Sequence, residues 1–240
     1  MLDDAELVKA GAEGVTAALF APFADLISRL LGRAADEGGV ILGEMVHDLG
    51  RRRQLRTARV LKRTQDFLTI EAIPAEQVEM KVLVPLLESA SLEEDDELQD
   101  RWAALLARTA TGTRVPGAVE ILRQLTSGDV ETLQSCYDFV HNIETTTWKE
   151  EDDKIRAGGP MPPPPPFDPS SYDLTSALEK RKWQIVERQN HHWIHTGKYG
   201  QPAEFYVYLD NVIRLGLLSS SGKNLTRIGY SIIAACQIPR

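Results

Sequence analysis

Three histidines near position 190, His191, His192 and His195, come closest in type and spacing to a metal site. His191 and His195 are four residues apart, so a helix would place both on one face, as in many zinc sites. The surrounding Cys, Asp and Glu residues do not complete a tetrahedral ligand set at a familiar motif spacing. We therefore expect this segment to pack through Trp193 and Tyr199 and to bind neither a metal nor a cofactor.

An acidic turn, Glu93–Glu97, is a second group that could do chemistry, because carboxylate oxygens bind hard cations such as Ca²⁺. Asp95, Asp96 and Asp100 would be the ligands. Carboxylates at the start of a helix are also stabilised by the helix dipole without any ion, and we favour this interpretation. The chain has no glycine-rich phosphate loop and no nucleophile elbow, so we expect no catalytic residues and no enzyme activity.

The basic residues of this acidic chain cluster in one predicted helix, Val40–Leu68. Its polar face carries Arg51, Arg52, Arg53, Arg56, Arg59, Lys62 and Arg63. Such a cluster could neutralise phosphates of nucleic acid or of lipid headgroups. It could equally be a solvated face whose partner is the acidic turn of the same chain, and we favour this second alternative. The candidate interaction surface is the basic face together with Glu93, Glu94, Asp95 and Asp96.

The helices that position these groups are best defined in the middle of the chain. Ser91 followed by Glu94 is a capping-box pattern, which predicts a helix beginning near Leu92. Residues at helical spacing should face the core, namely Leu98, Trp102, Leu105, Leu106 and Thr109. Gly112 is expected to end that helix and Pro116 to open another. The buried face of this next helix would be Val119, Leu122 and Leu125.

Helices are also predicted at residues 5–32, 40–68 and 75–89, with breaks at Pro22 and Pro85. Pro22, Asp25 and Arg29 interrupt the most apolar run, which is also short for a bilayer span. We expect its apolar face to pack into the core. The alternative is that residues 11–31 meet a membrane surface or a partner.

The C-terminal half begins with a helix predicted from Thr126 or Ser127 to about Asn142, where an irregular insertion, residues 143–172, is expected to follow. Pro162–Pro166 should form a polyproline II rod. A linker is the interpretation we favour, and a docking peptide for an aromatic-lined groove is the alternative. A further helix is predicted over Tyr172–Gln189, with Leu174, Leu178, Trp183, Ile185 and Val186 as core residues.

The last segments resemble a winged helix-turn-helix. A helix over Pro202–Leu215 is expected to precede two short strands at Leu217–Leu225, with Gly222 in the turn. Thr226 should cap a final helix bearing Ile228, Ile232, Ile233 and Cys236. In the recognition-helix position only Asn211 and Arg214 are side chains that typically read bases, so we favour a structural or protein-binding module over a DNA-binding one.

Composition sets the general class. The 240 residues carry a formal net charge of −8, which argues against a protein that binds nucleic acid over its whole surface. Cys136 and Cys236 lie among apolar neighbours, which favours buried free thiols over a disulfide. The first residues have no positively charged stretch, so we expect a cytoplasmic protein.

Three strings, LEEDDELQDRWAALLA, VPGAVEILRQLTSGDVETL and LDNVIRLGLL followed by LTRIGYSIIAAC, are similar in type and order to the Abi-alpha (abortive infection alpha) family. The resemblance runs from roughly residue 30 to the C-terminus. It implies a bacterial setting of phage defence and supplies no catalytic motif.

Taken together, the sequence predicts a mainly α protein with a helical N-terminal bundle at residues 1–125. A winged-helix-like region with one short β-hairpin and the proline-rich insertion would occupy residues 126–240. We expect a non-enzymatic antiphage protein that acts through contacts with a protein partner or a second copy. The alternatives are a DNA-binding regulator and a membrane-associated effector.

Overall fold

The computed structural model describes residues 18–32, 50–113, 115–156, 168–182, 184 and 203–238. Over these ranges the protein is mainly helical, and its β-structure is limited to one bridged pair of residues. The chain divides into two compact units. Unit 1 comprises Met1–Arg123 and Ala235–Arg240, and unit 2 comprises Gln124–Ala234.

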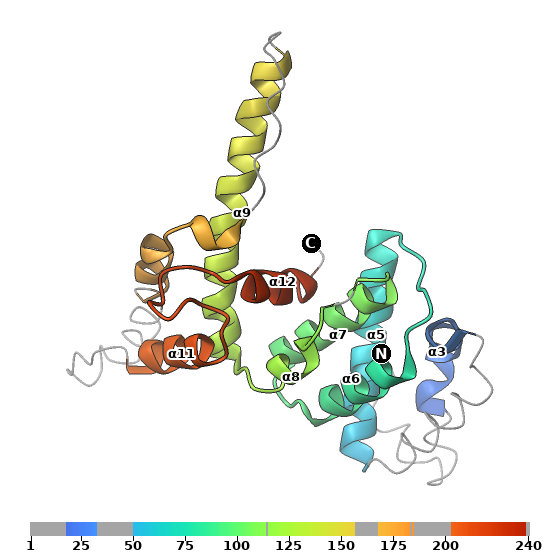
Figure 1. The fold of residues 1–240 in the computed structure, drawn as a ribbon. Helices are drawn as coiled ribbons and strands as arrows, with labels where there is room; N and C mark the ends of the chain where they lie inside the picture. The colour runs from blue at the N-terminus through green and yellow to red at the C-terminus, as the bar shows by residue number, and fades with distance from the viewer. Residues whose placement is uncertain are drawn as a thin grey trace. The chain divides into compact units, whose positions relative to one another are not determined.

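Unit 1 is built around three helices that pack on one another, of which α5 and α7 are in closest contact (Figure 1). Its elements are η1 (Ala21–Phe23), α3 (Ala24–Leu31), α5 (Arg51–Glu71), α6 (Met80–Leu92), α7 (Asp96–Ala110) and α8 (Ala118–Leu122). Small buried residues of α7, such as Ala103 and Ala107, leave room for α5 to approach. Thr64 of α5 lies at this contact, with its hydroxyl 3.3 Å from the carbonyl oxygen of Ala103.

Four of the five predicted core residues of α7 are confirmed, and the fifth, Thr109, is only half-buried. Leu98, Trp102, Leu105 and Leu106 are all buried, and Trp102 is only 1% exposed. Gly112 follows the helix with φ of +83°, a backbone conformation that glycine adopts without strain. In α8, Leu122 is buried, whereas Val119 is only half-buried.

The predicted capping box at Ser91 is wrong. Ser91 belongs to the last turn of α6, which continues through Pro85 as far as Leu92. The N-cap of α7 is Asp95, whose Oδ1 accepts hydrogen bonds from the amides of Glu97 (2.9 Å) and Leu98 (3.0 Å). A carboxylate at the N-cap satisfies the first free amides and suits the positive end of the helix dipole.

The apolar face of α3 packs inside unit 1. Phe23, Leu26, Leu30 and Leu31 are buried, as expected for residues of a core-facing helix. The carbonyl of Leu30 accepts a hydrogen bond of 2.8 Å from the amide of Val78, which ties α3 to the segment before α6. No helix among the described residues is long and apolar enough to cross a membrane. Residues 33–49, where the basic helix was predicted to begin, lie outside the described residues.

Unit 2 is organised around α9, a helix of 30 residues. Its other elements are η3 (Pro169–Ser171), helical residues 175–182, α11 (Ala203–Arg214) and α12 (Arg227–Ala235), of which the last residue belongs to unit 1. Val130, Leu133, Cys136 and Val140 of α9 are buried at the spacing typical of a core-facing helix.

The prediction that residues 143–172 form no regular element is wrong for the first fourteen of them, because α9 extends from Ser127 to Arg156. The yellow end of α9 stands clear of the other described helices of its unit in Figure 1. The hydroxyls of Thr145 and Thr146 donate back to the carbonyls of His141 (2.9 Å) and Asn142 (2.8 Å). The threonines are thereby accommodated in the helix. Pro162–Pro166 and the three histidines lie outside the described residues.

Among the described residues, the segment predicted as a hairpin contains one antiparallel bridge, Leu218 to Leu225, and no longer strand. The amide of Ser219 donates to the carbonyl of Asn224 (2.8 Å), and Gly222 has φ of +70° in the turn. The Thr226 hydroxyl caps α12 by accepting from the amide of Gly229 (3.0 Å), as predicted.

Three of the four core positions predicted for the final helix are confirmed, because Ile232, Ile233 and Cys236 are buried. Phe205 and Val212 of α11 are buried as well. The prediction that Ile228 faces the core is wrong, because this residue of the first turn of α12 is 56% exposed although it lies one turn before the buried Ile232.

Candidate interaction surface

Exposure divides the basic cluster of α5 into two sets. Residues seven apart make almost two full turns and point the same way. Arg56 and Arg63 form one such pair and are half-buried, as is Arg53. Arg52 and Arg59 form the other pair and are exposed, together with Arg51 and Lys62. The first set points toward the junction of α6 and α7, and the second toward solvent.

Arg53 and Arg56 bind the end of α6. The Nε and Nη2 atoms of Arg53 donate to the hydroxyl of Ser91 at 3.1 and 2.9 Å. Arg56 donates to the carbonyl of Leu92 at 3.4 Å and forms an ion pair with Glu94. These contacts satisfy carbonyl and hydroxyl groups where α6 ends, which is why Ser91 is held in α6 and does not cap α7.

Arg63 binds the start of α7. Its Nη1 donates to the carbonyl of Asp96 at 3.0 Å, its Nη2 lies 3.4 Å from Asp96 Oδ1, and its Nε lies 3.0 Å from Asp100 Oδ1. Burial raises the pKa of Asp100 above its usual value, while the charge of Arg63 opposes this shift. The sequence suggested the acidic turn of the same chain as the partner of the basic face, and the structure shows this pairing for Arg56 and Arg63.

The acidic turn is also tied to its own backbone. Glu93 Oε1 accepts from the amides of Glu94 and Asp95 at 2.9 and 3.0 Å, and Asp95 caps α7. The side chains of Glu94 and Asp96 remain about three-quarters exposed, at 78% and 75%. Among the described residues, no group of Asp, Glu, His or Cys side chains has the arrangement of a metal site.

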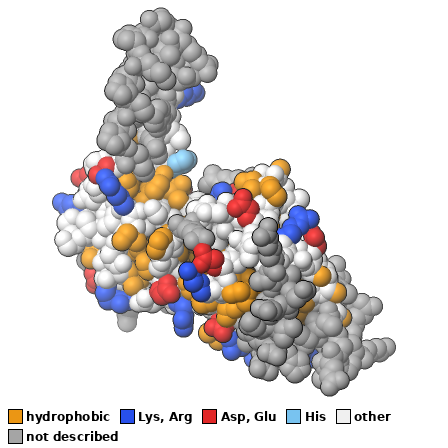
Figure 2. Space-filling view, turned by 45° about the vertical axis from the view of Figure 1, so that its right-hand side comes forward, with side chains coloured by type: hydrophobic (Ala, Val, Ile, Leu, Met, Phe, Trp, Pro, Cys, Tyr) orange, Lys and Arg blue, Asp and Glu red, His pale blue; other side chains and the backbone are white. Residues whose placement is uncertain are grey.

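Four cations of α5 face solvent: Arg51, Arg52, Arg59 and Lys62. We call them the exposed basic stripe. They form no ion pair within the part of the chain that the structure describes. Ile70, five turns beyond Arg52 on the same side of the helix, is 58% exposed. Figure 2 shows that Lys and Arg side chains alternate with Asp and Glu among the described residues of the face drawn.

In unit 2, the two side chains that could read bases are occupied by internal contacts. Asn211 of α11 donates to Asp129 Oδ2 at 2.7 Å and to the carbonyl of Gln124 at 3.3 Å. Asp129 in turn accepts from the amide of Thr126, so Asn211 supports the N-terminal cap of α9. Arg214 donates to Asn211 Oδ1 at 2.7 Å. The exposed side of α11 instead presents Tyr206 and Val207, which are 43% and 64% exposed.

Sequence analysis missed one buried charge in unit 2. Arg181 is 3% exposed and forms an ion pair with Glu131 of α9. The sequence does indicate that this position is buried, because Arg181 falls at helical spacing from the buried residues Leu174 and Leu178. A charged residue at a position reserved for the core indicates either an internal ion pair or a ligand site.

Comparison with known proteins supplies the biological class. The family model described as abortive infection alpha matches residues 52–238, from the first turn of α5 to the end of the described chain. No curated protein and no solved structure matches the chain. The match covers most of the sequence and includes both units, and the chain therefore belongs to the abortive infection alpha family.

Proposed function

We propose that this protein defends a bacterial host against phage by binding a protein partner, without catalysis, and that the exposed basic stripe is the contact surface. Family membership supports the defence setting. The observation that carries the contact surface is that Arg51, Arg52, Arg59 and Lys62 are exposed and unpaired among the described residues, while neighbouring arginines serve the fold.

An acidic protein surface suits the stripe better than a nucleic acid. The whole chain carries a net charge of −8, so a long polyanion would be repelled by most of the molecule. A protein contact can be confined to the stripe. Ile70 is exposed near the far end of the stripe and adds apolar surface of the kind that arginine-rich protein interfaces bury.

We further propose that α11, the turn at residues 217–226 and α12 form a reduced winged helix-turn-helix with a structural role. The antiparallel bridge between Leu218 and Leu225 supports a wing of minimal length. The hydrogen bonds of Asn211 to Asp129 and Gln124 argue against the alternative of a DNA-binding regulator, because they occupy the side chain best suited to base contacts.

The burial of the described apolar residues argues against the membrane-associated alternative. The apolar side chains of residues 23–31 that would have met a lipid surface, such as Leu26 and Leu30, are buried inside unit 1. The two buried free thiols, Cys136 and Cys236, favour a reducing compartment, and we propose the cytoplasm.

Phage plaque assays on cells expressing the protein test the proposal. Reversing the stripe (R51E, R52E, R59E and K62E together) should abolish protection while far-UV circular dichroism and the thermal midpoint stay close to those of the parent. A matched control that keeps every charge (R51K, R52K, R59K and K62R) should protect as the parent does. Full protection by the reversed variant would refute the role of the stripe.

A mobility-shift assay with duplex DNA separates the DNA-binding alternative. We expect no shift even at low salt, where contacts to phosphate are strongest. A shift at low salt that is lost steeply on adding salt, and that the stripe reversal removes, would replace the protein partner with nucleic acid.

A further inference from the structure

A cavity of about 360 Å³ lies in unit 2 between α9 and the helical residues 175–182 and 184. Its wall combines hydrogen-bonding side chains with apolar surface that includes Phe139 and Ala177. The volume falls at the lower end of the range typical for pockets that bind small molecules. The proposed contact surface on α5 makes no use of this cavity.

The buried guanidinium of Arg181 forms part of the cavity wall. One side of it is held by the ion pair with Glu131. Its Nε is buried and has no hydrogen-bond partner among the described residues. A buried donor without an acceptor is costly, so the ion pair with Glu131 does not use all the hydrogen-bonding capacity of this guanidinium.

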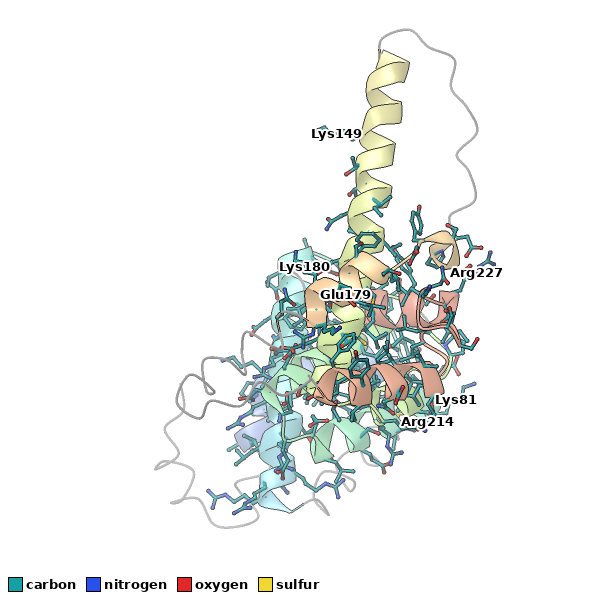
Figure 3. The ribbon with its side chains drawn as sticks, turned by 90° about the vertical axis from the view of Figure 1, so that its left-hand side faces the viewer. Lys81, Lys149, Glu179, Lys180, Arg214 and Arg227 are labelled. Carbon is teal, nitrogen blue, oxygen red and sulfur yellow. The ribbon has the colours of Figure 1, made fainter. Side chains whose placement is uncertain are left out.

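Lys180 lines the same cavity from the next position of the helix, and its ammonium group forms no ion pair within the described residues. Figure 3 labels Lys180 and its neighbour Glu179 on the helix beside α9 (Figure 3). Lys182 of that helix differs, because it pairs with Glu179 at 3.6 Å and does not line the cavity. Two cationic side chains at adjacent positions therefore line the cavity. Arg181 is ion-paired with Glu131, and Lys180 forms no ion pair within the described residues.

The remaining lining groups define the ligand further. The side chains of Ser176 and Asn142 add a hydroxyl and an amide that make no hydrogen bond within the described residues. The carboxylate of Asp138 already accepts a hydrogen bond of 2.7 Å from Gln134, which leaves acceptor capacity for a ligand hydroxyl. The ring of Phe139 offers a flat apolar surface for stacking.

We propose that this cavity binds a small phosphorylated molecule that carries a ring, of the size of a nucleoside monophosphate. Lys180, Arg181 and Ser176 would bind the phosphate oxygens, since oxyanions are the acceptors that cationic donors bind most strongly. Phe139 would contact the ring, and Asp138 would accept from a hydroxyl.

Isothermal titration calorimetry on the full chain tests this site with adenosine monophosphate, adenosine and inorganic phosphate as probes. Adenosine monophosphate should bind at one site per chain and more tightly than either fragment. K180Q should weaken binding about tenfold or more, since a hydrogen bond to a charged group is lost. K182Q, the matched control on the same helix, should bind as the parent does.

Two outcomes would overturn the proposal. One is the absence of saturable binding by both adenosine monophosphate and phosphate. The other is equal weakening by K180Q and K182Q, which would indicate a general effect of charge. Inorganic phosphate binding as tightly as adenosine monophosphate would overturn the part assigned to Phe139. Because Lys180 is exposed, its replacement should leave the fold intact, and circular dichroism checks this.

Discussion

Arg59 and Arg63 lie about one turn apart on α5, yet only Arg63 is tied into the fold. Arg63 contacts Asp96 and Asp100 at the start of α7, and its side chain is 27% exposed. R63A should therefore lower the free energy of unfolding by about 1 kcal/mol, whereas R59A should change it by less than about 0.5 kcal/mol. Urea unfolding of both variants measures the difference. Equal effects would show that the contacts of Arg63 add nothing to stability.

The two cysteine thiols should be inert in the folded protein. Burial raises the pKa of Cys136 and of Cys236 from 9.0 to about 12. Because the folded pKa is raised, the thiols ionise first in the unfolded chain, so the folded state should lose stability as pH rises from about 9 to about 12. We expect no reaction with a thiol reagent at pH 8 until denaturant is added, when two thiols per chain should react. Fast reaction of a native thiol would contradict the burial.

At the scale of single elements, α9 should have two different stabilities along its length. Its first half buries Val130, Leu133 and Val140, whereas residues such as Thr146 and Lys149 further along are exposed. Backbone hydrogen bonds in the second half are therefore expected to open more easily. Hydrogen exchange followed by mass spectrometry should show slow exchange over residues 130–140 and fast exchange over residues 143–156. Equal protection of both parts would indicate that another surface covers the second half.

The length of α9 was missed because its second half has no apolar stripe. Periodicity detects helices that bury one face, and it gives no signal for a helix that stays in solvent. Thr145 and Thr146 also suggested a break, since β-branched residues have low helix propensity. Their hydroxyls bond to carbonyls of the preceding turn, and the following Lys and Glu residues favour helix, so the chain continues without a cap.

The core of α7 could be predicted because four large apolar residues share one face, and that face is buried. Its start could not, because Ser91 and Asp95 are both good N-caps and the local pattern does not rank them. The contacts of Arg53 and Arg56 with the end of α6 decide between them. Those contacts join residues far apart in sequence. The same is true of the contacts with Asp96 and Asp100 that distinguish Arg63 from Arg59. For this reason the sequence identified the basic cluster but not its division into two sets.

At the scale of the whole molecule, the last residues of the chain complete unit 1. Cys236 is buried, and its carbonyl accepts a hydrogen bond of 3.1 Å from Nη1 of Arg101, a side chain that is 6% exposed. A buried guanidinium that loses an acceptor destabilises its surroundings. The stability of unit 1 should therefore depend on residues more than a hundred positions away from its helices, while unit 2 should be less affected.

Removing residues 236–240 tests this dependence. Trp102 is the only one of the four tryptophans in unit 1 and is 1% exposed, so a chain with Trp148, Trp183 and Trp193 replaced by Phe reports the unfolding of unit 1 by fluorescence. The truncation should lower the free energy of this transition by about 2 kcal/mol, the sum of one charged hydrogen bond and the buried thiol. A chain that lacks only Pro239 and Arg240 serves as the control and should unfold as the parent does. If both truncations leave the Trp102 transition unchanged, the C-terminal residues do not belong to the folded core of unit 1, and its stability must come from residues 18–123 alone.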